Sequence, residues 1–231
     1  MVLFDLRWHL RAWRAQARWA RTRAAIRDWL HTAPPGYDEL LLFGASAGWM
    51  MPDDFLGRFR RIDAVDFEWA AAPLFRWRHA GVVRERGISL TFHRTEAIGA
   101  LDRLLAAHPR ALVLFDNVLG QYTLTCRDIA LAEARLGEIQ RRLRGRAWGS
   151  VHDALSGEGA RLALADEPAP VPLAPGAPWP DQPLLRQVGA RGEWRDHLTR
   201  GLLPRQAGSV MVPWQLAPGY WHWLQAGWVP A

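Results

Sequence analysis

Between residues 36 and 160 the hydrophobic positions form short apolar runs that alternate with longer amphipathic segments. The first four runs begin 23 to 26 residues apart. Short apolar runs bounded by turn residues are typical of buried strands, and helical periodicity in the intervening segments predicts helices. The predicted strands are residues 39–43, 62–66, 88–92, 111–115 and 147–152, and the predicted helices are residues 53–60, 69–79, 97–108 and 128–144.

This alternation predicts the fold class. Strands and helices that take turns at such spacing form βαβ units, whose right-handed crossovers place helices on both faces of a parallel sheet. We therefore expect an α/β protein with a doubly wound, mostly parallel, Rossmann-like sheet. Near the end, "SVMVPWQL" and "YWHWLQAGWV" flank Pro218 and Gly219, which predicts an antiparallel hairpin. Residues 193–201 predict a short helix before that hairpin.

Residues 4–30 predict a basic amphipathic helix at the N-terminus, which the Pro34-Pro35-Gly36 sequence would end. Its predicted apolar face, which would pack on the body of the fold, consists of Leu6, Leu10, Trp13, Ala17, Ala20 and Ala24. Its arginine face consists of Arg7, Arg11, Arg14, Arg18 and Arg21. This face either contacts RNA or another acidic partner or simply faces water.

The segment between the predicted sheet and the hairpin is rich in proline. Residues 168–183 contain seven prolines, a composition that predicts a loop or an extended linker rather than a helix or a central strand. We expect one domain over residues 1–231. It would comprise the N-terminal helix (1–35), a cofactor-binding core (36–160), a Pro-rich insertion (161–192) and a C-terminal helix and hairpin (193–231).

Composition removes several classes of function. All 29 basic residues are arginine, and the absence of lysine excludes P-loop proteins, protein kinases and enzymes that form a Schiff base or bind pyridoxal phosphate. The net charge of +6 favours acidic partners. Because there is one cysteine, Cys126, we expect no internal disulfide and no cysteine-based zinc site.

The chain also shows no targeting or membrane signal. It has no apolar run of the ~20 residues that a membrane-spanning helix needs, and its first residues lack a continuous apolar core of the kind found in signal peptides. We therefore expect a cytoplasmic protein without a membrane partner.

Polar or flexible residues follow each predicted strand of the core. They are the glycine-rich loop 44–48, Asp66, Glu96, the pair Asp116 and Asn117, and the pair His152 and Asp153. Parallel strands bring these positions to one edge of the sheet, where ligands bind. A glycine-rich turn followed by an acid at the end of the second strand, 18 residues beyond Gly48, indicates a nucleoside-containing cofactor.

Residues 37–160, together with the tail at 193–229, resemble the class I S-adenosylmethionine-dependent methyltransferases. "ELLLFGASAG" is similar to the first motif of that family, "IDAVDFEWAAAPLFRWR" to the second and "ISLTFHRTEAIGAL" to the third. "ALVLFDNVLGQ" looks like the fourth strand and the start of the substrate-facing loop. The closing hairpin looks like the antiparallel pair that distinguishes this family from dehydrogenases.

The resemblance implies S-adenosylmethionine as the cofactor and an acceptor that the sequence does not identify. It places Gly44, Ser46 and Gly48 beneath the amino-acid part of the cofactor, Asp66 on the ribose and Glu96 on the adenine amino group. Substrate would contact Asn117 and Gln121, and the proton would pass to His152 or Asp116. The chain departs from the family pattern at Leu42, where an acid is usual, and at Ser46, where a glycine is usual. A non-catalytic binding protein on the same fold is therefore an alternative.

A second alternative reads the same loop as G-x-S-x-G, the turn that presents a nucleophilic serine. Ser46, Asp116 and His152 follow one another in the order that this hydrolase class requires. That turn normally follows several strands, whereas here it would follow the first. His197 and His222 have no metal-ligand spacing with a carboxylate, so no metal site is predicted. We expect the C-terminal tryptophans to lie in the core: Trp194, Trp214, Trp221, Trp223 and Trp228.

Overall fold

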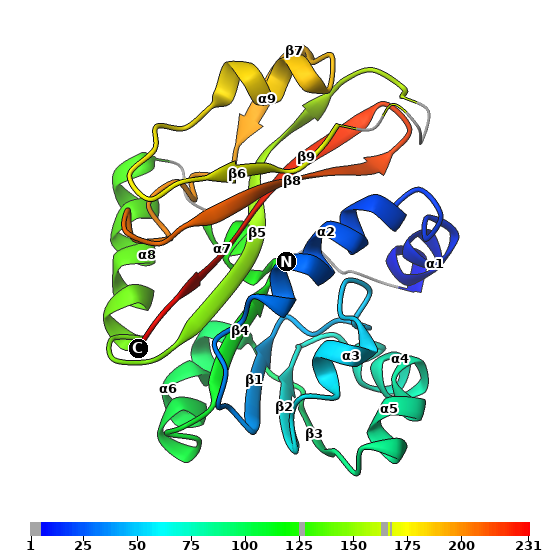
Figure 1. The fold of residues 1–231 in the computed structure, drawn as a ribbon, viewed down its shortest axis with the longest axis vertical. Helices are drawn as coiled ribbons and strands as arrows, with labels where there is room; N and C mark the ends of the chain where they lie inside the picture. Colours follow the sequence, from blue (N-terminus) through cyan, green and yellow to red (C-terminus); the bar gives the residue numbers. More distant parts are fainter. Residues whose placement is uncertain (1–5, 125–127, 163–165, 167) are drawn as a thin grey trace.

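The computed structural model describes residues 6–124, 128–162, 166 and 168–231. Cys126 lies outside these residues. Within them the strands form one nine-stranded sheet with the order β3-β2-β1-β4-β5-β9-β8-β6, and β7 pairs with the outer part of β5 (Figure 1). The predicted fold class, a doubly wound α/β sheet with an antiparallel C-terminal hairpin, is confirmed.

The first five strands are parallel and are those predicted from the apolar runs. They are β1 (Glu39–Phe43), β2 (Arg61–Val65), β3 (Ser89–His93), β4 (Leu112–Asp116) and β5 (Trp148–Glu158). β1 lies between β2 and β4, with Phe43 opposite Val65 and Phe115. Strands covered on both faces read as continuous apolar runs, which is why the sequence identified them.

Helices cover both faces of this parallel sheet. Leu41 and Phe43 of β1 pack with α6 and α8, while Leu40 and Leu42 face α2 and α3. Glu96 caps α6 by accepting hydrogen bonds from its first turn. The helices are α3 (Asp53–Leu56), α4 (Ala71–Arg78), α5 (Ala80–Glu85), α6 (Ala97–Ala107), α7 (Val118–Thr123) and α8 (Ile129–Arg142). In the described part of the chain no helix combines the length and the apolar character that crossing a membrane requires.

The predicted hairpin is confirmed as β8 (Ser209–Ala217) and β9 (Tyr220–Val229), and β9 runs antiparallel along the whole of β5. The predicted helix at 193–201 is wrong, because β7 (Arg191–Asp196) is a strand there. β5 extends well beyond its neighbour β4, and this extension offers a free edge with which β7 pairs. A long-range pairing has therefore overridden the local preference.

The Pro-rich segment contains more structure than the sequence predicts. β6 (Val171–Leu173) pairs with β8 at the end of the sheet, and α9 (Asp181–Gln187) begins inside the predicted loop. Pro172 fits β6 because an edge strand leaves some backbone N–H positions without a sheet partner. The prediction that this segment holds no central strand agrees with the structure.

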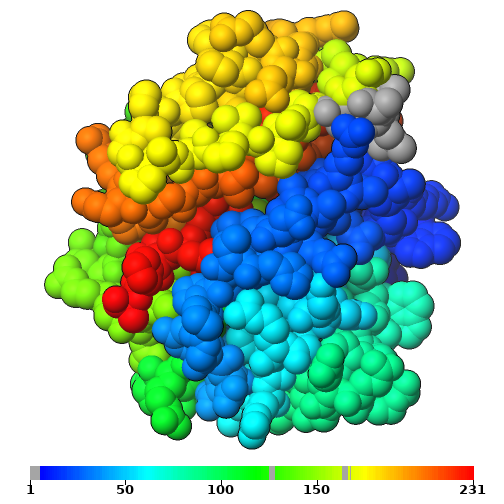
Figure 2. All heavy atoms as spheres, viewed as in Figure 1, coloured from blue at the N-terminus to red at the C-terminus, as the bar shows by residue number. Residues whose placement is uncertain are grey.

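The N-terminal segment forms two helices, α1 (Leu6–Arg14) and α2 (Ala20–His31), and its predicted apolar face is wrong. Leu6, Leu10 and Trp13 are 53%, 44% and 59% exposed. A second stripe, offset by two positions, is the one that packs inward: Trp8, Ala12, Ala15, Trp19, Thr22, Ile26 and Trp29. Figure 2 shows the N-terminal segment lying between the C-terminal strands and the first strands of the sheet.

Hydrogen bonds to the C-terminal hairpin fix the position of α2 and the turn that precedes it. Trp19 Nε1 donates to the Gln215 carbonyl at 3.1 Å, and Thr22 Oγ1 donates to the Pro213 carbonyl at 2.8 Å. The segment around α2 thus meets the C-terminal hairpin above the carboxyl ends of the parallel strands.

Candidate functional site

A cavity of about 460 Å³ lies at the carboxyl ends of β1, β2 and β4, beneath the N-terminal segment. Its floor is the point where the strand order reverses, since β1 has β2 on one side and β4 on the other. Seven residues predicted from the sequence line it: Gly44, Ser46, Asp66, Glu96, Asp116, Asn117 and Gln121. Two predicted residues, Gly48 and His152, do not line it.

Gly44 is required by the close approach of the loop to β4. Its φ is +77°, and a Cβ there would lie 2.4 Å from the Asp116 carbonyl oxygen and 2.3 Å from the Val118 side chain. Ser46 also has a positive φ, +45°, which is the left-handed region that favours glycine. The loop therefore keeps the backbone shape of a glycine-rich turn although its middle residue is serine.

Asp66 holds this loop in place. Its Oδ2 accepts a hydrogen bond from Ser46 N at 2.8 Å, and its Oδ1 accepts one from Glu68 N at 2.9 Å. Burial raises the pKa of Asp66, against the opposing effect of these backbone bonds. Each carboxylate oxygen can accept a second hydrogen bond, so Asp66 can still contact a ligand hydroxyl.

Glu96 lines the cavity at the end of β3, but its carboxylate is already engaged. Its oxygens accept hydrogen bonds from Ile98 N at 2.9 Å and Gly99 N at 2.6 Å, which satisfies the first turn of α6. If Glu96 contacts adenine, as the family resemblance implies, it does so with the same carboxylate that caps α6.

Asp116 and Asn117 end β4 at the centre of the cavity. Burial, with a smaller effect of the Asp66 charge, raises the pKa of Asp116 to about 7. Asn117 adopts a left-handed conformation with φ +53°. Its Nδ2 donates to Asp153 Oδ2 at 2.9 Å, and its Oδ1 accepts from Asp153 N at 3.0 Å. The amide of Asn117 thus orients Asp153 in addition to lining the cavity.

The expectation that His152 faces the ligand is wrong. Its ring is fully buried outside the cavity, where Nδ1 contacts Ser150 Oγ at 2.9 Å and Nε2 contacts Gln225 Oε1 at 3.2 Å. Burial lowers the pKa of His152 to about 4. Successive residues of a strand point to opposite faces, so Asp153 occupies the cavity wall instead. The hydrolase alternative required His152 as the base for Ser46, and it fails for the same reason.

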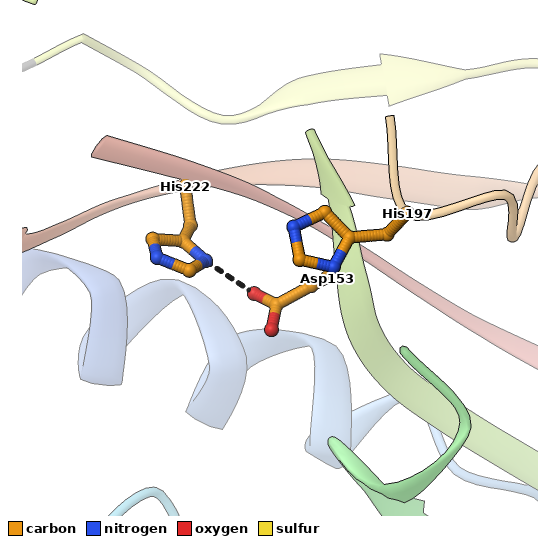
Figure 3. Close-up of side chains that lie close together, drawn as sticks. All are labelled: Asp153, His197 and His222. Carbon is orange, nitrogen blue, oxygen red and sulfur yellow. Dashed lines mark hydrogen bonds and ion pairs between the residues drawn. The ribbon is translucent and has the colours of Figure 1, made fainter. Parts of the chain in front are cut away.

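Asp153 meets two histidines that the sequence did not connect with it (Figure 3). His222 of β9 lies with Nδ1 2.6 Å from Asp153 Oδ1, and His197 follows β7. Burial acts to raise the pKa of Asp153, but the charge and hydrogen bond of His222 outweigh it and hold the value at about 2. Burial lowers the pKa of His197.

One ligand atom from each of Asp153, His197 and His222 lies within 4.8 Å of the others, so the three could hold a metal ion. This corrects the expectation that His197 and His222 share no arrangement with a carboxylate. Chain spacing gave no signal because β5, β7 and β9 come together only in the sheet. His197 Nε2 contacts Ser156 Oγ at 2.9 Å, and His222 Nε2 has no hydrogen-bond partner among the described residues.

The cavity is acidic and aromatic, although the protein as a whole is basic. Within the described chain no arginine lines it. Its five carboxylates are Asp66, Glu68, Glu96, Asp116 and Asp153. Trp214 of β8 faces His222 with ring centroids 5.2 Å apart and faces Trp19 at 5.1 Å. Trp214 is buried in the core, as predicted, and its ring also forms part of the cavity wall.

No protein-family model matches this chain, and no curated protein matches it. Among solved structures it is similar to the glycopeptide N-methyltransferase MtfA complexed with S-adenosyl-L-methionine, at 13% identity and a TM-score of 0.42, over 91% of this chain and 94% of that one. It is also similar to magnesium protoporphyrin IX methyltransferase, ChlM, from Synechocystis PCC 6803 with bound SAH, at 13% identity and a TM-score of 0.46, over 89% and 80% of the chains. A third is the N-methyltransferase NodS from Bradyrhizobium japonicum WM9, at 13% identity and a TM-score of 0.44, over 90% and 94%. At this identity the likeness describes the path of the chain and leaves the chemistry to the residues of the cavity.

Proposed function

We propose that this protein is a methyltransferase that uses S-adenosylmethionine and methylates a small-molecule acceptor. One observation carries the proposal: the 44–48 loop and Asp66 converge on a cavity at the point where the strand order of the sheet reverses. That is where doubly wound sheets bind nucleoside cofactors, with a glycine-rich turn near the backbone of the ligand and an acid near its ribose.

The charge of the cavity fits this cofactor. S-adenosylmethionine carries a positive sulfonium, and when bound it supplies an electrophilic methyl group. Five carboxylates and no arginine line the cavity among the described residues, so a cationic ligand is favoured over a phosphate-bearing dinucleotide. Asp66 and the 44–48 loop would hold the cofactor, and Asp116 would lie near the reacting end. The remaining work of the protein is to position the acceptor in line with the methyl group.

Titration calorimetry with S-adenosylmethionine and S-adenosylhomocysteine tests the proposal. We expect both to bind, and Asp66→Asn to weaken binding about tenfold because the loop and the ribose lose a charged acceptor. Asp102→Asn is the matched control, since Asp102 is an exposed carboxylate on the outer side of α6 that pairs with Arg142. Absence of binding by either compound at millimolar concentration would overturn the proposed function.

A second candidate is a non-catalytic binding protein that uses the arginine face of α1. Arg11 and Arg14 are exposed there, as the sequence predicted. If this is the function, RNA or another acidic partner binds with an affinity that falls steeply as salt rises, while neither adenosyl compound binds. An RNA mobility-shift series over salt concentration, run beside the calorimetry, separates the two candidates.

A further inference from the structure

One wall of the cavity contains a histidine, His222, that is not among the residues proposed to hold the cofactor. Asp153 lies 2.6 Å from His222 Nδ1, and a carboxylate can only accept a hydrogen bond. The hydrogen therefore resides on Nδ1, which leaves the lone pair of the neutral ring on Nε2. This nitrogen is buried and has no hydrogen-bond partner among the described residues, and other atoms of the His222 residue line the cavity. A buried imidazole oriented by a carboxylate is the usual arrangement of a general base.

The contact distance favours a proton rather than a metal ion between these two groups. Metal ligands at bond lengths of about 2.1 Å around a tetrahedral ion lie roughly 3.4 Å apart, well beyond the separation of a hydrogen-bonded pair. Distance alone assigns no role, because His79 and Asp53 make the same 2.6 Å contact outside the cavity. The position of His222 in the cavity wall is what distinguishes it.

Aromatic rings surround this base. Trp214 lies against His222 and also against Trp19, and Trp8 closes the group with its ring centroid 5.9 Å from that of Trp19. All three tryptophans and His222 line the cavity. Such walls favour a planar or aromatic group, and a cation beside them gains further attraction from the ring faces.

The charge of the cavity selects among the groups that could be methylated. Asp116 and Asp153 lie in the wall with His222, and the described residues place no arginine there. A phenolate or carboxylate acceptor would be repelled by the ionised carboxylate of Asp153. A protonated amine would be attracted, and its methylated product is again a cation.

We propose that the acceptor is an amine attached to a planar or aromatic group, and that His222 is the catalytic base that takes its proton. This rests on the proposed methyltransferase function. The ammonium gives one proton to His222 Nε2, and Asp153 stabilises the resulting imidazolium. The freed nitrogen lone pair forms a bond to the methyl carbon as the carbon–sulfur bond breaks, and that electron pair stays on sulfur. His222 later returns its proton to water.

Binding of three matched probes tests the acceptor class without turnover. Phenethylamine, phenethyl alcohol and hydrocinnamate share a phenyl ring and differ in charge. By calorimetry, with and without S-adenosylhomocysteine, we expect phenethylamine to bind at least about tenfold more tightly than hydrocinnamate. Asp153→Asn should remove most of that preference. Glu158→Gln should keep it, because Glu158 is an exposed carboxylate on the same strand outside this cavity.

Nitrogen NMR of isotope-labelled histidine tests the role of His222, with His222→Gln used to assign its signals. We expect the wild-type ring to carry its hydrogen on Nδ1, and phenethylamine to shift the Nε2 signal. In Asp153→Asn the preference for that tautomer should be lost, which a merely structural Asp153 would not produce. His31→Gln, which removes an exposed histidine paired with Asp54, should leave these signals unchanged.

The outcomes separate this inference from the function on which it rests. If S-adenosylhomocysteine binds but hydrocinnamate binds as well as phenethylamine, the acceptor class is wrong and the methyltransferase proposal stands. If neither adenosyl compound binds, the methyltransferase proposal falls. Tight Zn²⁺ binding that both His197→Gln and His222→Gln abolish would assign the cluster to a metal and overturn the role of His222 as base.

Discussion

The two halves of the cavity differ in how their polar groups are satisfied. In the half formed by β1, β2 and β3, Asp66 and Glu96 accept hydrogen bonds from nearby backbone N–H groups. In the half formed by β5 and β9, the side chains of Asn117 and His222 each contact one oxygen of Asp153, while His222 keeps one nitrogen without a partner among the described residues. The carboxylates of the first half thus hold the 44–48 loop and cap α6 through backbone groups, whereas the polar groups of the second half contact one another through side chains.

The largest effect is expected where the loop meets β4. Gly44→Ala should lower the free energy of unfolding by about 3 kcal/mol or more, because the new Cβ would overlap the Asp116 carbonyl and the residue would be left-handed. Urea unfolding measures this. Gly87→Ala is the matched control: Gly87 has φ +61° with open space around it, so only about 1 kcal/mol is expected. If both variants lose the same unfolding free energy, the contact of the new Cβ at position 44 with β4 does not destabilise the fold.

The second largest effect is expected at Asn117, which is hydrogen-bonded to Asp153. Asn117→Ala should cost about 2–3 kcal/mol, since it removes a hydrogen bond to a buried carboxylate and one from the Asp153 backbone. The same urea measurement applies, with Gln121→Ala as the comparison. Gln121 lines the cavity but is exposed, and its replacement should change stability by no more than about 0.5 kcal/mol. If both variants lose a similar amount of unfolding free energy, the hydrogen bonds of Asn117 to Asp153 do not stabilise the fold.

The loss of folding stability at acid pH should depend on the carboxylate of Asp153. Its pKa of about 2 in the folded protein lies below that of an unfolded chain. The ionised carboxylate therefore stabilises the fold above pH ~4 and loses that effect as pH falls toward 2, a change of about 2 kcal/mol. The difference in unfolding free energy between wild type and Asp153→Asn should shrink over this range. A difference that stays constant would contradict the pairing with His222.

The smallest effect is expected at Ser46, and it is a gain. Ser46→Gly relieves a side chain held at φ +45° and should raise the unfolding free energy by up to about 1 kcal/mol, less the added flexibility of the unfolded chain. Thermal unfolding measures the change. Ala45→Gly, at a neighbouring position without positive φ, should instead destabilise the protein. A loss in both variants would show that the serine conformation is unstrained.

The sequence predicted the parallel half of the fold because its strands are buried on both faces and therefore apolar throughout. The prediction was wrong in the N-terminal segment, where two hydrophobic patterns overlap. Residues 6–29 contain two apolar stripes two positions apart, and the one that begins with Leu6 and Leu10 is exposed. Which stripe packs inward depends on Gln215 and Pro213, whose carbonyls receive the Trp19 and Thr22 hydrogen bonds.

For the site, the rule that ligands bind at strand ends predicted six of the cavity residues, and the resemblance to the methyltransferase family added Gln121. It named His152 as the proton acceptor rather than Asp153, its neighbour at the end of the fifth predicted strand. The alternation of faces along β5 was the available signal, since Val151 also lines the cavity. His222 could not be found in this way, because no local feature of "YWHWLQ" reveals that it will lie beside β5 opposite Ser156.

The contacts between Trp19 and Gln215 and between Thr22 and Pro213 span 196 and 191 residues of sequence. During synthesis α1 and α2 are made long before their partners on β8. Contacts so distant in sequence are slow to form, since a long loop must close before they contribute. The cavity, which both segments line, is therefore complete only after these long-range contacts have formed.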